Sequence, residues 1–150
     1  MGLLIGIARA ARKRAPLAEI GEAEVTLSLG IVGDARGTKP GRQVTVLFQE
    51  SWKAACRDLD VRLSWTTRRA NLLVEGVPVP GQGARLAVGE LVLEVTDETK
   101  PCQVMEAAHR GLRRALTPEW RGGVTCQVLK GGTIRVGDRV EVWNEHGQPA

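Results

Sequence analysis

Cys102 is the residue of this sequence that is best placed to do chemistry. It follows Pro101, and proline suits the first turn of a helix because its missing N–H would be unpaired there in any case. The free backbone N–H groups and the positive dipole end of a helix stabilise a thiolate, and Lys100 adds a cation two residues away. Cys102 is therefore a candidate reactive thiolate or soft metal ligand, and the alternative is a small apolar filler at a helix start.

The other cysteines and the histidines offer less chemistry. Cys56 and Cys126 fall within a predicted helix and a predicted strand, where burial as a small hydrophobe is the better interpretation. His109 lies seven residues beyond Cys102, about 10 Å along a helix, which is too far for direct pairing or shared metal ligation. Three cysteines without CxxC spacing argue against a disulfide framework or a structural zinc site and favour a reducing cytoplasm.

Four arginines are predicted to gather near strand ends and turns, namely Arg36, Arg42, Arg68 and Arg69. Asn71 follows Arg69 by two residues, so in a strand both side chains would point to the same face. An arginine grips phosphate with two parallel N–H groups, and an asparagine offers a donor and an acceptor to the edge of a heterocycle. The pair predicts a site for a phosphate or a flat polar ring, and the alternative is an exposed arginine rim.

The hydrophobic pattern predicts the elements that must position these side chains. Strands are expected over residues 3–10, 24–29, 42–48, 71–79, 84–96, 124–129, 133–136 and 139–143, and helices over residues 49–59 and 101–116. Turns rich in Gly and Pro separate the strands. We therefore expect a mainly β fold, a β-barrel or sandwich with about two short α-helices, and a closed or partly open barrel would also protect the strand edges.

Length and charge exclude several classes of protein. The 150 residues suit one core, so we expect a single domain over residues 1–150 with a polar tail at 143–150. The formal charge of +4 is local, because four basic residues at positions 9–14 account for it. Aromatic residues, on which single-stranded nucleic acid would stack, make up only 3% of the chain. Nucleic acid is therefore not an expected partner. No apolar run reaches the roughly 18 residues of a membrane helix, so no membrane association is expected. The oligomeric state is left open.

Several short motifs follow one another in a specific order. They are Gly33-Asp34-Ala35-Arg36, Arg42 to Leu47 with Glu50, Arg68 to Gly76, Lys100-Pro101-Cys102, Gly122-Gly123-Val124, and Gly132-Thr133-Ile134 followed by Gly137 to Val140. This order and spacing resembles the MOSC domain over about residues 4–142. MOSC domains occur in molybdenum-cofactor sulfurases, in the amidoxime-reducing components of mitochondria, and as short stand-alone bacterial proteins, which this chain resembles.

The resemblance implies a MOSC-type β-barrel that binds molybdopterin, with the cysteine of the Pro-Cys motif bonded to molybdenum in the reductases. That cysteine is Cys102 here. The Arg-x-Asn segment of the family lies against the pterin and is offered by Arg69 and Asn71. Basic residues of the first loop approach the phosphate, for which the candidates are Arg12, Lys13 and Arg14. The remaining basic candidates for cofactor binding are Arg36, Arg42 and Lys100.

The function implied by the resemblance is that of a molybdenum-dependent oxidoreductase that reduces N-hydroxylated or N-oxide compounds. The chain has no iron–sulfur cysteine spacing and no dinucleotide-binding glycine fingerprint, so an external reductase would have to supply electrons. The alternative is a non-catalytic carrier of the cofactor, or of persulfide sulfur on Cys102, that serves other molybdoenzymes. A third class is a regulatory module. The pyridoxal phosphate domain of the sulfurases is not expected in this chain, nor is its Schiff-base lysine.

Overall fold

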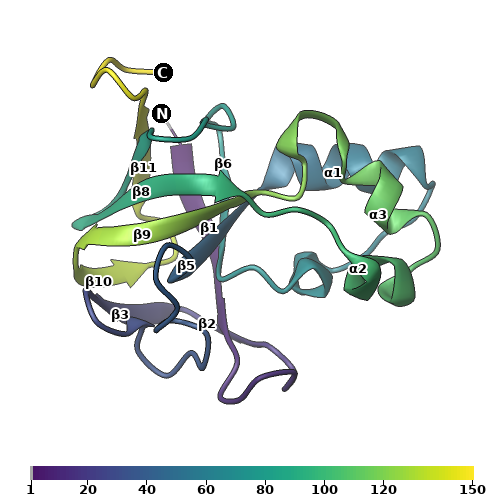
Figure 1. Cartoon of the computed structure of the whole chain (residues 1–150), viewed down its shortest axis with the longest axis horizontal. Coiled ribbons are helices and arrows are strands. Elements are labelled where there is room, and N and C mark those ends of the chain that lie inside the picture. Colours follow the sequence, from purple (N-terminus) through teal and green to yellow (C-terminus); the bar gives the residue numbers. More distant parts are fainter. Residues whose placement is uncertain (1) are drawn as a thin grey trace.

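Seven strands close into a β-barrel in the computed structural model, which describes residues 2–150. They are β1 (Gly2–Arg9), β5 (Val44–Phe48), β6 (Leu72–Glu75), β7 (Arg85–Val88), β8 (Leu91–Glu98), β9 (Val124–Lys130) and β11 (Arg139–Trp143). The ring runs β1-β11-β7-β8-β9-β5-β6 and back to β1, and only β5 and β6 pair in parallel (Figure 1). The predicted mainly β barrel is confirmed, and it is closed.

Two smaller groups of strands complete the β structure. The short β2 (Ala18–Ile20) pairs with β1 outside the ring, and β10 (Gly132–Arg135), β3 (Glu22–Thr26) and β4 (Gly30–Ile31) form a separate three-stranded sheet. Val25, Ile31 and Ile134 of this small sheet are buried in the same core as the barrel side chains. The small sheet is thus packed against the barrel and shares its hydrophobic interior.

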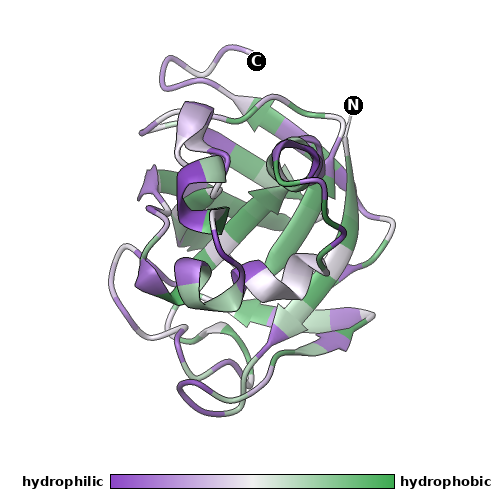
Figure 2. Ribbon diagram, turned by 90° about the vertical axis from the view of Figure 1, so that its right-hand side faces the viewer, coloured by the Kyte–Doolittle hydropathy of each residue, from purple (hydrophilic) through white to green (hydrophobic). Residues whose placement is uncertain are grey.

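The helices lie together on one side of the barrel, as Figures 1 and 2 show. They are α1 (Gln49–Asp58), α2 (Gln103–Ala108) and α3 (Leu112–Ala115), with the short 3₁₀ helices η1 (Trp65–Arg68) and η2 (Pro118–Trp120). Side chains alternate along β5, so Val46 and Phe48 enter the barrel core while Leu47 enters a second core beneath the helices. This second core buries Trp52 and Met105 and fixes the helical side against the barrel.

Three predicted strands have different bounds in the structure. The segment 84–96 is a hairpin of two strands, because Gly89 adopts a φ of +56° and turns the chain between β7 and β8. The strand expected over 24–29 ends at Thr26. Val25 is buried but Leu27 is 60% exposed, so the alternating pattern marked a buried face only as far as Val25. The strand expected over 71–79 ends at Glu75, before a turn at Gly76.

The predicted helix over 101–116 is broken into α2 and α3. His109 is extended with a φ of −158°, and Gly111 follows in the left-handed region with a φ of +86°. The Glu106 carboxylate accepts the Gly111 N–H at 2.9 Å and stabilises the break. The apolar spacing that suggested one helix therefore belongs to two short helices that pack their apolar residues into the same core. No helix within residues 2–150 has the length and apolar character to cross a membrane.

Gly123 joins the helical side to β9 at a place where a side chain has no room. Its φ is +92°, and an added Cβ would collide with the Val46 carbonyl oxygen on β5. We expect Gly123→Ala to lower the free energy of unfolding by about 3 kcal/mol, because left-handed strain and the collision add together.

Gly137→Ala is the matched control for this prediction. Gly137 also has a positive φ, of +101°, but an added Cβ would meet nothing within 4 Å. Its substitution should cost only the backbone strain, about 1 kcal/mol. Urea unfolding of both variants measures the difference, and equal losses of stability would show that the collision at Gly123 is relieved.

Candidate functional site

A cleft of about 630 Å³ lies between the barrel and α2. Its walls come from the loop after β1, the loop between β4 and β5, the segment after η1, the end of β8 and the start of α2. Seven basic side chains line it, namely Lys13, Arg14, Arg36, Lys39, Arg42, Arg68 and Arg69. No acidic residue is among its lining residues. A cleft of this size and charge suits an anionic ligand of cofactor dimensions.

Cys102 lines this cleft and is exposed, whereas Cys56 and Cys126 are buried. The predicted burial of those two cysteines is confirmed. Complete burial raises the pKa of the Cys126 thiol, which keeps that sulfur neutral and unreactive. Among the three cysteines, the thiol that a ligand in the cleft can reach is therefore that of Cys102.

The backbone position of Cys102 differs from the sequence-based expectation. Cys102 is the residue that caps α2, with an extended φ of −132°, and does not lie within the first helical turn. Its carbonyl oxygen accepts the Met105 N–H at 2.9 Å, while its thiol makes no capping hydrogen bond. The Cys102 side chain is consequently free to contact a ligand.

Arg68 is a buried cation without an acidic partner in the part of the chain that the structure describes. Its Nε donates to the Gly122 carbonyl at 2.9 Å, and its Nη2 donates to the Thr99 carbonyl at 2.7 Å. Burial lowers the pKa of the Arg68 guanidinium, and negative charge on Cys102 opposes that shift. The guanidinium stays charged at neutral pH, so it lends positive charge to the end of the cleft that holds Cys102.

Arg36 and Arg69 form a pair of cations that is held in place by other groups of the protein. The buried Asp34 carboxylate pairs with the Arg36 guanidinium at 3.0 Å, and Arg36 Nη1 donates to the Arg69 carbonyl at 2.7 Å. Arg69 Nη2 in turn donates to the Ala15 carbonyl at 2.8 Å. Burial lowers the pKa of Arg69, and the positive charge of Arg36 adds to this shift. Two guanidiniums are thus held close together by groups of the protein.

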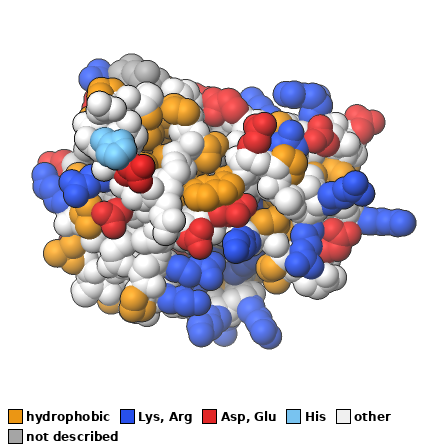
Figure 3. All heavy atoms as spheres, turned by 45° about the horizontal axis from the view of Figure 1, so that its top comes forward, with side chains coloured by type: hydrophobic (Ala, Val, Ile, Leu, Met, Phe, Trp, Pro, Cys, Tyr) orange, Lys and Arg blue, Asp and Glu red, His pale blue; other side chains and the backbone are white. Residues whose placement is uncertain are grey.

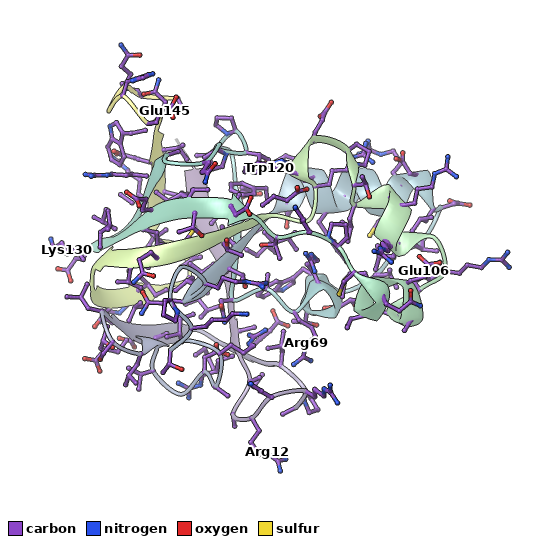
Figure 4. All side chains as sticks on the ribbon, viewed as in Figure 1. Arg12, Arg69, Glu106, Trp120, Lys130 and Glu145 are labelled. Atoms are coloured by element: carbon purple, nitrogen blue, oxygen red, sulfur yellow. The ribbon has the colours of Figure 1, made fainter. Side chains whose placement is uncertain are left out.

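Arg69 and Asn71 do not share a strand face as expected. Arg69 follows η1 with a φ of +64°, and β6 begins only at Leu72. Both residues line the cleft all the same. Figure 4 shows Arg69 between the loop that carries Arg12 and the helix α2. The turn, and not strand alternation, brings Arg69 to the site.

Asn71 is 2% exposed and ties two barrel strands together. Its Oδ1 accepts the Thr45 N–H of β5 at 3.0 Å, and its Nδ2 donates to the Ala8 carbonyl of β1 at 3.2 Å. These bonds satisfy buried backbone groups of two strands. The side chain is therefore structural, and one of its two amide N–H groups is not used by these bonds.

The other candidates fall into two groups. Lys13, Arg14 and Arg42 are exposed and line the cleft. Lys100 is exposed but is not among the lining residues, and Arg12 points away from the molecule at the tip of its loop (Figure 4). The chain thus presents three of its exposed basic candidates to the cleft.

Sequence reasoning missed several lining residues, including Lys39, Thr99 and Met105. Lys39 and Arg42 flank Pro40-Gly41, a dipeptide that predicts a turn. The cations on either side of this turn could have indicated that Lys39 lies at the site together with Arg42. Arg68 was recognised as one of a cluster, yet the burial that distinguishes it depends on tertiary contacts. Gly122 was recognised only as part of the Gly122-Gly123-Val124 motif, and Thr99 carries no local signal.

The sequence model of the MOSC domain matches residues 33–141, which is more than half of the chain. The chain belongs to the MOSC domain family. The family resemblance expected from the motifs is thus confirmed, while the single-domain boundaries at residues 1–150 stay a prediction. The matched residues include the loop between β4 and β5, the turn after η1, and Cys102. Strand β1 precedes the matched range but belongs to the barrel of this MOSC protein.

Solved bacterial structures share this fold. The YuaD protein from Bacillus subtilis matches with a TM-score of 0.82 and 19% identity, over 95% of this chain and 96% of that one. YiiM from Escherichia coli matches with a TM-score of 0.70 and 15% identity, over 93% and 69% of the two chains. YiiM from Geobacillus stearothermophilus gives 0.67 and 13%, over 93% and 71%. A comparison with curated protein sequences finds no match.

We expect Asn71→Leu to lower the free energy of unfolding by about 3 kcal/mol, because the Thr45 N–H and the Ala8 carbonyl would both lose a buried partner. The same substitution at Asn144, whose Oδ1 accepts two N–H groups in an exposed turn, is the control and should cost about 1 kcal/mol or less. Denaturant unfolding measures both. A cost at Asn71 no larger than that at Asn144 would contradict its role as a tie between strands.

Proposed function

We propose that this MOSC protein binds the molybdenum cofactor (Mo-molybdopterin) and reduces N-hydroxylated or N-oxide compounds, with Cys102 as the metal ligand. Family membership supports the association with the cofactor, and some MOSC members are molybdenum-dependent reductases. The observation that carries the proposal is the position of Cys102. Its exposed thiol lies in a cleft that is lined by seven cations and no acid.

The residues of the cleft fit a ligand of this kind. A thiolate is a soft donor that suits molybdenum, and guanidiniums match the oxygens of a phosphate. The Thr99 Oγ1 is buried and has no hydrogen-bond partner within residues 2–150, so a polar ligand could satisfy it. At Gly122 an added Cβ would meet the Thr99 carbonyl oxygen at 2.6 Å, so the wall at that point has to be bare backbone.

Each group of side chains would then hold a different part of the ligand. Cys102 would hold the metal, with the charge of Arg68 beside it stabilising the thiolate. The fixed guanidiniums of Arg36 and Arg69, with the spare N–H of Asn71, would hold polar edges of the pterin. The phosphate would be held by Lys13 and Arg14 of the first loop, and Lys100 would add positive charge near Cys102 from outside the lining.

The reduction consumes two electrons and two protons, so that an N–OH group becomes N–H and water leaves. When bound, the cofactor supplies the redox chemistry of this step, and an external reductase supplies the electrons. The protein contributes orientation and electrostatics. The buried charge of Arg68 stays in place throughout because two backbone carbonyls hold it, so no reorganisation of this cation is needed during the reaction.

Two measurements test the proposal. Molybdenum and pterin content, measured on protein from a host that makes the cofactor and from one that does not, shows whether the cofactor is retained. Loaded protein is then given a chemical reductant and an N-hydroxylated base. A reductase turns the base over repeatedly, whereas a carrier of cofactor or sulfur retains molybdenum without turnover.

Cys102→Ala should abolish retention of molybdenum while leaving the stability of the fold within about 0.5 kcal/mol, because its exposed thiol contributes little packing. Cys56→Ala is the control. Cys56 is 7% exposed in the second core, so its loss should cost about 1 kcal/mol and leave molybdenum retention unchanged. Elemental analysis and urea unfolding of both variants check this, and an exchange of the two phenotypes would refute the assignment of Cys102.

A further inference from the structure

The turn that carries Lys39 and Arg42 is anchored firmly to the barrel. The Arg42 N–H donates to the Lys39 carbonyl at 3.0 Å, which closes the turn. Gly41 lies at its apex with a φ of +75°; its N–H donates to the Gln127 Oε1 at 2.6 Å, and its carbonyl accepts the Thr96 hydroxyl. Side chains of β8 and β9 thus hold both backbone polar groups of one residue. The two cations project from a backbone that cannot easily move away.

Neither cation of this turn is neutralised by the protein. Lys39 and Arg42 are exposed, both line the cleft, and neither forms an ion pair in the described part of the chain. Arg42 lies close enough to Arg68 for its positive charge to lower the pKa of Arg68. Like charges are therefore crowded at the end of the cleft that holds Cys102. Figure 3 shows a group of Lys and Arg side chains at the lower edge of the face in view.

The cations of the cleft exceed what one phosphate needs. A phosphate monoester carries about two negative charges, which two cations can match. Lys13 and Arg14 already provide such a pair on the first loop, next to the segment that binds Arg69 at Ala15. Lys39 and Arg42 belong to a different loop, and Arg42 lies close enough to Arg68 for its charge to act on it. The family resemblance made Arg42 a candidate for cofactor binding, but Lys13 and Arg14 suffice for the cofactor phosphate, so the Lys39–Arg42 pair is available to another anion.

We propose that the Lys39–Arg42 turn is a subsite for an anionic group of the substrate, so that this protein prefers N-hydroxylated compounds that carry a phosphate or a carboxylate. The inference rests on the proposed function, because it assigns the substrate class of the same cleft. A pair of exposed cations on an anchored turn raises the local concentration of an anion at that place in the cleft. The reacting N–OH group would then lie toward Cys102.

The test compares charged and neutral forms of the same substrate. Loaded protein with reduced methyl viologen as electron donor is given N4-hydroxycytidine 5′-monophosphate or N4-hydroxycytidine. We expect kcat/KM for the nucleotide to exceed that for the nucleoside about tenfold at low salt, and the ratio to fall as salt screens the charges. A second pair, 4-carboxybenzamidoxime and benzamidoxime, shows whether a carboxylate is accepted as well as a phosphate.

Substitutions of Lys39 and Arg42 show whether the preference for the nucleotide arises at this turn. The double variant Lys39→Gln/Arg42→Gln should bring the nucleotide-to-nucleoside ratio close to one and leave the molybdenum content unchanged. Lys53→Gln/Arg57→Gln on α1 removes the same two charges from exposed positions outside the cleft lining, and it should keep the ratio. Equal kcat/KM for the two substrates in the unmodified protein would overturn the inference. Loss of molybdenum from the double variant at Lys39 and Arg42 would also overturn the inference, because it would show that the turn binds the cofactor.

A binding measurement separates this inference from the proposed function. If neither substrate turns over, the proposed reductase activity fails, and calorimetry with cytidine 5′-monophosphate still tests the subsite. The double variant at Lys39 and Arg42 should then bind this nucleotide about tenfold more weakly than the unmodified protein and the α1 control. Equal affinity in all three proteins would overturn the subsite.

Discussion

The buried charge of Arg68 is the constraint around which the cleft is organised. A guanidinium inside a protein needs partners, and here they are the carbonyls of Thr99 and Gly122, at the end of β8 and just before β9. Arg68 itself closes η1. Three segments that are distant in sequence are thereby held together. The positive charge left beside Cys102 forms no ion pair within residues 2–150, although the more distant charge of Glu98 also acts on it. The two backbone carbonyls offset the desolvation of the guanidinium without neutralising it, so its charge stays available to a ligand.

The architecture could be predicted from the sequence to a large extent because barrel strands have strong local signals. Alternation and β-branched residues marked β1, β5, β9 and β11, and Gly-rich turns marked their ends. The errors arose where one pattern covered two elements. Within residues 84–96 the buried positions change from even numbers to odd numbers across Gly89, and this change of phase marks the turn that a single predicted strand overlooked. The break at Gly111 is hidden because both short helices bury residues in one core.

The candidate site was only partly predictable. Cys102 and the cations of the family motifs could be named from residue type and order, and all of them except Lys100 and Arg12 line the cleft. Burial could not be foreseen, since it depends on contacts between distant segments. Asn71 has a polar side chain that looked suited to a ligand, but it uses most of its hydrogen bonds on β1 and β5. Arg68 and Arg69 are adjacent and both donate to backbone carbonyls, yet Arg68 is buried and Arg69 is only half-buried.

The pairing of β1 with β11 has a consequence for synthesis and folding. Gly2 pairs with Val140, so the first strand of the chain finds its final neighbour only when one of the last strands has left the ribosome. Contacts of such long sequence separation form slowly, because a large loop must be closed before they contribute any stability. Until β9 is made, the β7-β8 hairpin and the β5-β6-β1 strands have no strand between them, and until β11 is made the ring cannot close. Several strand edges are therefore unpaired during most of translation, and unpaired edges favour aggregation.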